Sequence, residues 1–170
     1  MLGYLFTSPL SFLIWFGALL IAITVHEYAH AWASDRLGDP TARLAGRLTL
    51  NPFAHLDPIG TLMLLIFRFG WGKPVPFDPF NLRYPRRDAA LISFAGPASN
   101  LIFATILSII IRLAHLTIGS PAYFLELALT PLVVLCVVLA IFNLIPIHPL
   151  DGGKVLIGLL PLDLARKWDE

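Results

Sequence analysis

The chain has 170 residues, of which 57% are hydrophobic and 14% are charged, and its mean hydropathy is +0.77. In soluble domains roughly a quarter of all residues are charged, so this composition is typical of an integral membrane protein. The formal net charge of +1 produces no global field that would favour a nucleic-acid partner, and we expect none. The single cysteine, Cys136, excludes an intramolecular disulfide and a cysteine-based zinc site, and its apolar neighbours indicate a packing or lipid-facing role.

Three apolar segments are each long enough to cross a bilayer as a helix, which takes about 20 residues. They cover about residues 10–33, 89–113 and 123–145. The first 35 residues contain no Lys or Arg, so a signal peptide is not indicated and the first span is expected to be retained. Two shorter apolar stretches, 58–70 and 154–164, are predicted to be re-entrant or partly inserted, the second broken at Pro161. The sequence therefore predicts an all-α polytopic bundle in which residues 1–170 form one domain.

Positive charges predict the orientation of these spans. Eight of the 12 Lys and Arg residues lie in one connecting region: Arg36, Arg43, Arg47, Arg68, Lys73, Arg83, Arg86 and Arg87. Since cytoplasmic loops carry the excess of Lys and Arg, this region is expected to be cytoplasmic and the N-terminus outside. The last three arginines are expected to contact anionic headgroups, although a solvated loop would have the same pattern.

The first span contains the motif "HEYAH". His26 and His30 are four residues apart and lie on one face of a helix, so both imidazoles can reach one zinc ion at about 2.0–2.1 Å. Glu27 can then take a proton from a water molecule that the metal activates. The alternative is a polar membrane edge paired with Arg36 or with headgroups. An ionisable group in a span costs at least about 2.5–3.5 kcal/mol, so three together favour the metal site.

A catalytic zinc ion usually takes a third protein ligand and keeps one position open. The candidates are His55, His115, His148, Asp57, Asp88, Glu126 and Asp151. The charge distribution puts His115 and Glu126 on the far side of the membrane, and Asp88 is expected to pair with the arginines before it. Asp151 follows the third span in "NLIPIHPLDGG", where prolines keep the backbone irregular. Such backbone is tolerated inside protein or beside a water-filled cavity, although the pattern leaves the other candidates open.

Three motifs together resemble the site-2 protease family of intramembrane zinc metalloproteases (peptidase M50-like) over most of the chain. They are "HEYAH" in the first span, "FAGPASN" opening the second and "NLIPIHPLDGG" after the third. The resemblance implies that His26, His30 and Asp151 bind one zinc ion and that Glu27 is the general base. No PDZ or CBS domain is found, so the chain is similar to the compact branch. Relatives usually continue beyond the final "LDLARKWDE" into another span, so a C-terminally truncated core is expected.

The resemblance also implies roles for less specific positions. Asn143 would lie beside the zinc and hold substrate or the developing oxyanion, which is compatible with a helix C-cap. Asn100 is a family position near the active-site helices, although an interhelical hydrogen bond among small residues is favoured there. Lys73 and Val75 resemble a family strand that could pair with unwound substrate, with a surface loop as the alternative. His148 stands where relatives commonly have Pro. We expect it to point at water, with a second-shell donor or a competing ligand as alternatives.

These observations predict an intramembrane zinc metalloendopeptidase in the plasma membrane of a prokaryote, with its active site toward the cytoplasm. Its expected partners are the lipid bilayer and single-span membrane-protein or signal-peptide substrates, and no oligomeric state is predicted. The alternative is a non-proteolytic metal carrier, sensor or scaffold. A carrier needs ligands on both sides of the membrane, where the far side offers only His115 and Glu126, and an inactive scaffold would lack Glu27. Other membrane zinc proteases take a later Glu as third ligand, for which Glu126 is badly placed.

Overall fold

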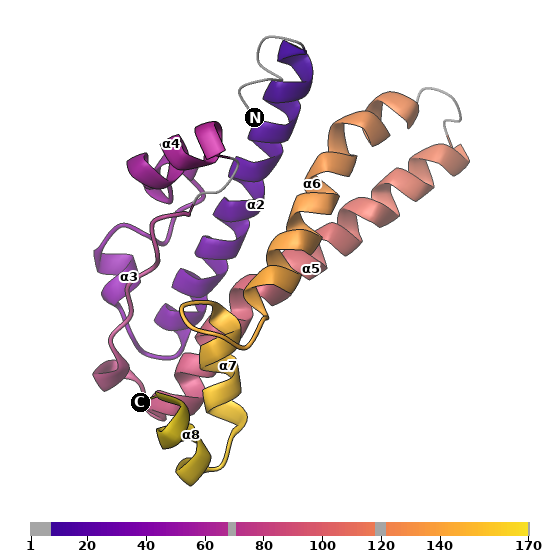
Figure 1. Ribbon diagram of the computed structural model, residues 1–170. Coiled ribbons are helices and arrows are strands. Elements are labelled where there is room, and N and C mark those ends of the chain that lie inside the picture. The colour runs from indigo at the N-terminus through magenta and orange to yellow at the C-terminus, as the bar shows by residue number, and fades with distance from the viewer. Residues whose placement is uncertain (1–7, 68–70, 118–121, 170) are drawn as a thin grey trace.

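The computed structural model describes residues 8–67, 71–117 and 122–169 (Figure 1). Three helices are long and apolar enough to cross a membrane: α2 (Pro9–Arg36), α5 (Pro85–Thr117) and α6 (Ala122–Asn143). The shorter elements are α3 (Thr41–Leu44), η1 (Pro52–Ala54), α4 (Pro58–Phe67), η2 (Pro79–Asn81), α7 (Asp151–Leu159) and α8 (Leu162–Asp169). The three predicted spans are therefore confirmed, and the chain is an all-α, multi-pass integral membrane protein.

Helix α5 is the common partner of the bundle, because it packs against α2, α6 and α7. It runs antiparallel to α2, and α6 returns along it (Figure 1). The helices meet through small side chains, including Ala18 and Ala22 of α2, Ala104 of α5 and Cys136 of α6. Small residues allow the backbones of membrane helices to approach closely. The predicted packing role of Cys136 is confirmed, since it is fully buried in this cluster.

The connection between α2 and α5 is held by one buried carboxylate, Asp39. Its oxygens accept hydrogen bonds from Ser34 Oγ at 2.9 Å, Thr41 Oγ1 at 2.5 Å and Thr41 N at 3.1 Å. Two further donors come from the end of the connection: Asp78 N and Asn81 Nδ2, both at 2.8 Å. Burial alone would raise the pKa of Asp39, but these hydrogen bonds outweigh it and lower the pKa to about 2.

A buried arginine holds the middle of the same connection. The guanidinium of Arg47 donates hydrogen bonds to the backbone carbonyls of Ala54 and Lys73, and the side chain is only 4% exposed. Burial lowers the pKa of Arg47, and attraction to the carboxylate of Glu27 in α2 opposes that shift. Arg47 therefore fixes the two loops on either side of α4 to each other, close to α2.

The proline-rich segment 72–78 is extended, but it does not form the predicted strand. Its one ladder contact is an isolated antiparallel bridge between Leu56 and Gly72. Pro74 and Pro76 lack the backbone N–H that a longer ladder requires, which explains why pairing stops after the bridge. The part of the chain that the structure describes contains no named strand.

The described residues of the two short apolar stretches form short helices. Asp57 begins α4 by accepting a hydrogen bond from Gly60 N at 2.7 Å. The second stretch divides into α7 and α8 at Pro161, as expected. Their insertion into the membrane stays a prediction. Arg68 of the predicted positive region lies outside the described residues.

Candidate metal centre

The centre is built around one turn of helix α2. His26 and His30 are buried at 6% and 8% exposure, and their rings meet edge to face with centroids 4.6 Å apart. The Nε2 atoms of the two rings are 3.0 Å apart. The i, i+4 spacing therefore brings two potential ligand atoms to one point inside the bundle.

The second ring nitrogen of His30 fixes its chemical form. Nδ1 lies 2.7 Å from the backbone carbonyl oxygen of Ile92 in α5. Because a carbonyl oxygen only accepts hydrogen bonds, Nδ1 carries the hydrogen and Nε2 of the neutral ring is left with a free lone pair. A carbonyl partner of this kind orients a metal-ligating histidine and increases its basicity.

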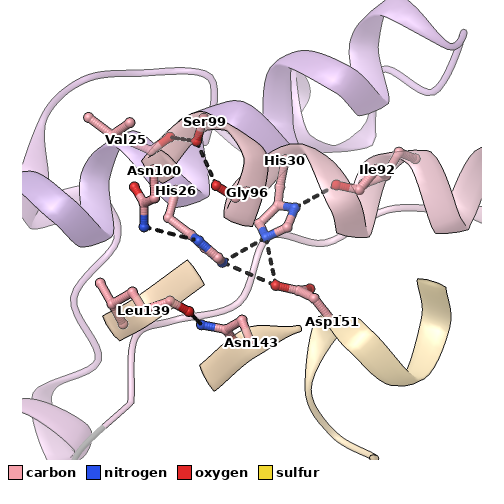
Figure 2. A network of polar contacts seen from close by, with 10 residues as sticks. All are labelled: Val25, His26, His30, Ile92, Gly96, Ser99, Asn100, Leu139, Asn143 and Asp151. Carbon is pink, nitrogen blue, oxygen red and sulfur yellow. Dashed lines mark hydrogen bonds and ion pairs between the residues drawn. The ribbon is translucent and has the colours of Figure 1, made fainter. Parts of the chain in front are cut away.

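The third group is Asp151, the first residue of α7. Its Oδ2 lies 3.1 Å from His26 Nε2 and 3.2 Å from His30 Nε2 (Figure 2). Burial would raise the pKa of Asp151, but its contacts with His26 and His30 hold the pKa below the usual range for a carboxyl group. Among the described residues, these three form the only group of His, Cys, Asp or Glu arranged to hold a metal ion.

The geometry of this group fits a zinc ion. Zinc lies about 2.0–2.1 Å from each ligand, so its tetrahedral ligand atoms are roughly 3.3 Å apart. The observed separations of 3.0, 3.1 and 3.2 Å form a nearly equilateral triangle, which matches one face of such a tetrahedron. When both Nε2 atoms carry lone pairs, the two atoms repel each other at this distance, and a cation between them removes the repulsion. The donor set therefore suits a divalent metal with an open fourth position.

Gly96 of α5 allows the histidine pair to lie against that helix. A Cβ atom at this position would be 2.4 Å from His30 Nε2 and 2.8 Å from His26 Cε1, closer than side-chain atoms approach. This role of Gly96 is not among the predictions made from the sequence. The available signal was a glycine directly before Pro97 inside an apolar helix, where glycine is otherwise unfavourable.

Gly152 has a similar role at the start of α7. A Cβ atom there would lie 2.4 Å from the carbonyl oxygens of both Leu144 and Ile145. The irregular turn after α6 therefore packs directly on the residue that follows Asp151. This contact explains why a Gly follows the candidate third ligand in "LDGG".

Glu27 lies next to the histidine pair and faces the extended segment. Its side chain is half-buried, and its Oε1 would be 3.8 Å from a Cβ atom built on Gly72. Arg47, which anchors that segment, is close enough to attract the carboxylate. A carboxylate beside the metal position and next to an extended backbone has the placement that a general base needs.

The two asparagines lie on different sides of the histidine pair (Figure 2). Asn143 ends α6, and its Nδ2 donates to the Leu139 carbonyl oxygen at 2.9 Å, as expected for a residue at a helix end. Asn100 is fully buried and its Nδ2 lies 3.4 Å from His26 Nδ1, which confirms the predicted hydrogen bond between α5 and α2. Nδ1 is the ring nitrogen on the side opposite the metal position, so this contact favours a supporting role for Asn100.

The remaining third-ligand candidates have other contacts. His55 is buried, with Nε2 2.8 Å from the Thr49 carbonyl oxygen. Asp88 is buried, and its Oδ1 is 3.2 Å from Arg87 Nε, which confirms the predicted pairing. His148 is exposed, as expected. The last two candidates pair with each other at the far ends of α5 and α6: His115 Nε2 lies 2.9 Å from Glu126 Oε2.

The alternative of a polar membrane edge is not favoured by the contacts. Arg36 stacks over the ring of Trp32 at 5.3 Å from its centroid, on the exposed side of α2. The histidines instead face Asp151. Lys73 contributes its backbone, with N donating to the His55 carbonyl oxygen at 2.9 Å. Its side chain is exposed, and Val75 is half-buried in the same extended segment.

Comparisons with known proteins agree with this chemistry. The chain is 39% identical over 156 residues to "Putative zinc metalloprotease YwhC" of Bacillus subtilis, covering 89% of this chain and 71% of that protein. It is 32% identical over 149 residues to "Putative zinc metalloprotease Rip2" of Mycolicibacterium smegmatis and 34% identical over 148 residues to the Rip2 protein of Mycobacterium tuberculosis. Those alignments cover 83% and 81% of this chain and 55% and 53% of the relatives.

No family model matches the chain. No solved structure matches it either. The extent of the similarity to YwhC shows that the chain belongs to the same zinc metalloprotease family.

Proposed function

We propose that residues 1–170 form the single catalytic core of an intramembrane zinc endopeptidase of the site-2 protease type. The observation that carries the proposal is the placement of His26, His30 and Asp151. Two of these ligands project from a helix that can span the membrane, and the third begins a helix directly after another span. A peptide bond reaches such a centre only at membrane depth, so the proposed substrates are single-span membrane proteins or signal-peptide remnants.

When bound, one zinc ion per chain would act as a Lewis acid and lower the pKa of water toward roughly 7. His26, His30 and Asp151 would hold it. Glu27 would take the proton of the attacking water and pass it to the leaving amine. Asn143 has a second side-chain N–H beyond the one bonded to Leu139, and this N–H would donate to the developing oxyanion of the substrate.

The extended segment 72–78 offers a place for unwound substrate. A helix hides its amide bonds, so a substrate has to unwind before it can be cut. Val75 lies between two prolines and keeps the backbone N–H that a pairing strand needs. The N–H and carbonyl groups of Lys73 are already bonded to His55 and Arg47, so they anchor the segment. We propose that substrate pairs with Val75 by β-augmentation, in the segment whose first residue, Gly72, lies near Glu27.

The proposed location is the plasma membrane of a prokaryote, with the centre toward the cytoplasm. His30 lies in the last third of α2, and the basic connection from Arg36 to Arg87 leaves the bundle at this same end (Figure 1). The preference of cytoplasmic loops for Lys and Arg supports the orientation. Reporter fusions at each end of the chain would test it.

The deciding experiment is cleavage of a single-span reporter in liposomes by the wild type, Glu27→Gln and Glu126→Gln. Glu27→Gln should bind as much zinc as wild type and lose cleavage by at least about a hundredfold, since general acid–base groups contribute roughly 10²–10⁴. Glu126→Gln is the matched control, because Glu126 lies half-exposed at the far end of α6 and should leave cleavage unchanged. Equal cleavage by wild type and Glu27→Gln would refute the assigned base. Zinc binding without cleavage by the wild type would instead favour a carrier, sensor or scaffold.

A further inference from the structure

Asn100 contains an unusual buried atom. The residue lies in α5 and is fully buried, and its side-chain oxygen Oδ1 has no hydrogen-bond partner. Figure 2 shows the amide nitrogen turned toward His26 Nδ1, at 3.4 Å, and the oxygen turned away. A buried polar atom without a partner costs about 1–3 kcal/mol. The amide of Asn100 contacts the ring of His26, so the hydrogen-bonding states of this histidine bear on the unpartnered oxygen.

The hydrogen positions on His26 depend on whether a metal is bound. Without metal, the amide nitrogen of Asn100 can donate to Nδ1, and Nε2–H of the ring can donate to Asp151 Oδ2 at 3.1 Å. With metal on Nε2, the hydrogen has to lie on Nδ1, since a neutral imidazole carries only one. An N–H of the ring would then face the NH₂ group of the amide, and two donors cannot form a hydrogen bond.

A half-turn of the amide resolves this conflict. Rotation of the Asn100 amide about its Cβ–Cγ bond exchanges Oδ1 and Nδ2, and the two positions are nearly equal in shape. Oδ1 would then accept the hydrogen bond from His26 Nδ1–H. The atom that lacks a partner in one state becomes the partner in the other. A carbonyl acceptor on Nδ1 is also what His30 receives from Ile92.

We propose that Asn100 is a positioning residue that serves both hydrogen-bonding states of His26 and turns its amide when the metal binds. The inference rests on the metal centre of the proposed function, and it assigns Asn100 to the histidine and not to the substrate. His30 has a fixed backbone acceptor and is held ready for the metal. His26 has a partner that can donate or accept, so the centre is stable empty and loaded.

The test measures the Co²⁺ affinity of three variants. The visible absorption of bound Co²⁺ reports the affinity while a chelator competes for the metal. Asn100→Leu removes both hydrogen-bonding groups at nearly the same volume and should weaken Co²⁺ binding roughly 10–100-fold, the usual effect of losing such a partner. Asn100→Asp keeps an acceptor for Nδ1–H and should bind within about threefold of wild type. Thr105→Val, five residues further along α5 and exposed, is the control and should bind as wild type does.

Two further readouts separate positioning from simple packing. The metal-free Asn100→Leu protein should melt no lower than wild type, because it also removes the unpartnered oxygen. The ¹⁵N spectrum of labelled histidines should show Nδ1 of His26 protonated in the loaded wild type. Unchanged Co²⁺ affinity in Asn100→Leu, or an equal loss in Asn100→Asp, would overturn the inference. A wild type that binds no Co²⁺ would refute the metal centre itself, and this result is distinct from the other two.

Discussion

Two carboxylates in this molecule have opposite surroundings. Asp39 is completely buried and accepts hydrogen bonds from five donors, each of which has a hydrogen to give. Asp151 is 18% exposed at its side chain and lies against two imidazole nitrogens that are themselves 3.0 Å apart. The first carboxylate is fully satisfied by the protein. The second has at most one donor in its group, the Nε2–H of His26, because Nε2 of His30 is an acceptor, and a cation would complete the group. The balance of donors and acceptors, and not burial alone, separates the structural carboxylate from the one proposed to bind the metal.

The largest expected effect is the loss of stability in Asp39→Ala. The substitution leaves five donors without an acceptor, including two backbone N–H groups, and should lower the free energy of unfolding by about 3 kcal/mol. Unfolding by SDS in mixed micelles would measure it. Asp35→Ala is the control, since Asp35 forms a partly exposed pair with Arg43 and should cost less than about 1 kcal/mol. Equal stability of the two variants would mean that Asp39 does not hold the connection.

The next effect is the pH dependence that Asp39 contributes. Its pKa of about 2 lies below the ordinary value of about 3.9, so the folded state favours the ionised form. This stability, about 2.5 kcal/mol, is present above pH ~4 and is lost as the pH falls toward 2. The stability difference between wild type and Asp39→Asn should therefore narrow by about half between pH 7 and pH 3. A constant difference over this range would show that the ionised form is not favoured.

Asp151→Ala tests the other carboxylate of this comparison, and it should affect metal binding more than stability. Zinc affinity should fall on the order of tenfold or more, because one of three ligands is lost. The rise in melting temperature on adding zinc should disappear, since that rise reports binding to the folded state. Asp39→Asn should have a lower melting temperature without zinc, and this melting temperature should still rise when zinc is added. If Asp151→Ala still bound one zinc ion per chain, Asp151 would not be the third ligand, and His148 or His55 would be the next candidates.

The smallest expected effect is at the contact between α7 and the extended segment. Lys154 Nζ lies 4.7 Å from the centroid of the Phe77 ring, and its side chain is exposed. Lys154→Met should cost about 0.5 kcal/mol of unfolding free energy, as exposed cation–π pairs do. A cost comparable to that of Asp39→Ala would mean that α7 depends on this contact more than on its docking against α5.

The spans and the histidine pair could be predicted because they depend on local sequence. Apolar length defines a span, and the i, i+4 spacing of His26 and His30 defines a shared face in any helix. The third ligand could not be derived this way, because its position depends on how α7 packs after an irregular turn. The resemblance to site-2 proteases pointed to Asp151, and the structure brings it to the histidines. The contacts of Gly96 were also beyond prediction, since they exist only between docked helices.

The separation of the metal ligands along the chain has a consequence for biosynthesis. Asp151 follows His26 by 125 residues, and helices α5 and α6 lie between them. During translation and insertion, α2 enters the membrane with two histidines and no third ligand. The centre closes only after α6 has been inserted and the turn behind it has folded onto Gly152. A nascent chain would therefore carry an incomplete centre, and the proposed hydrolysis could begin only after α6 and α7 are in place.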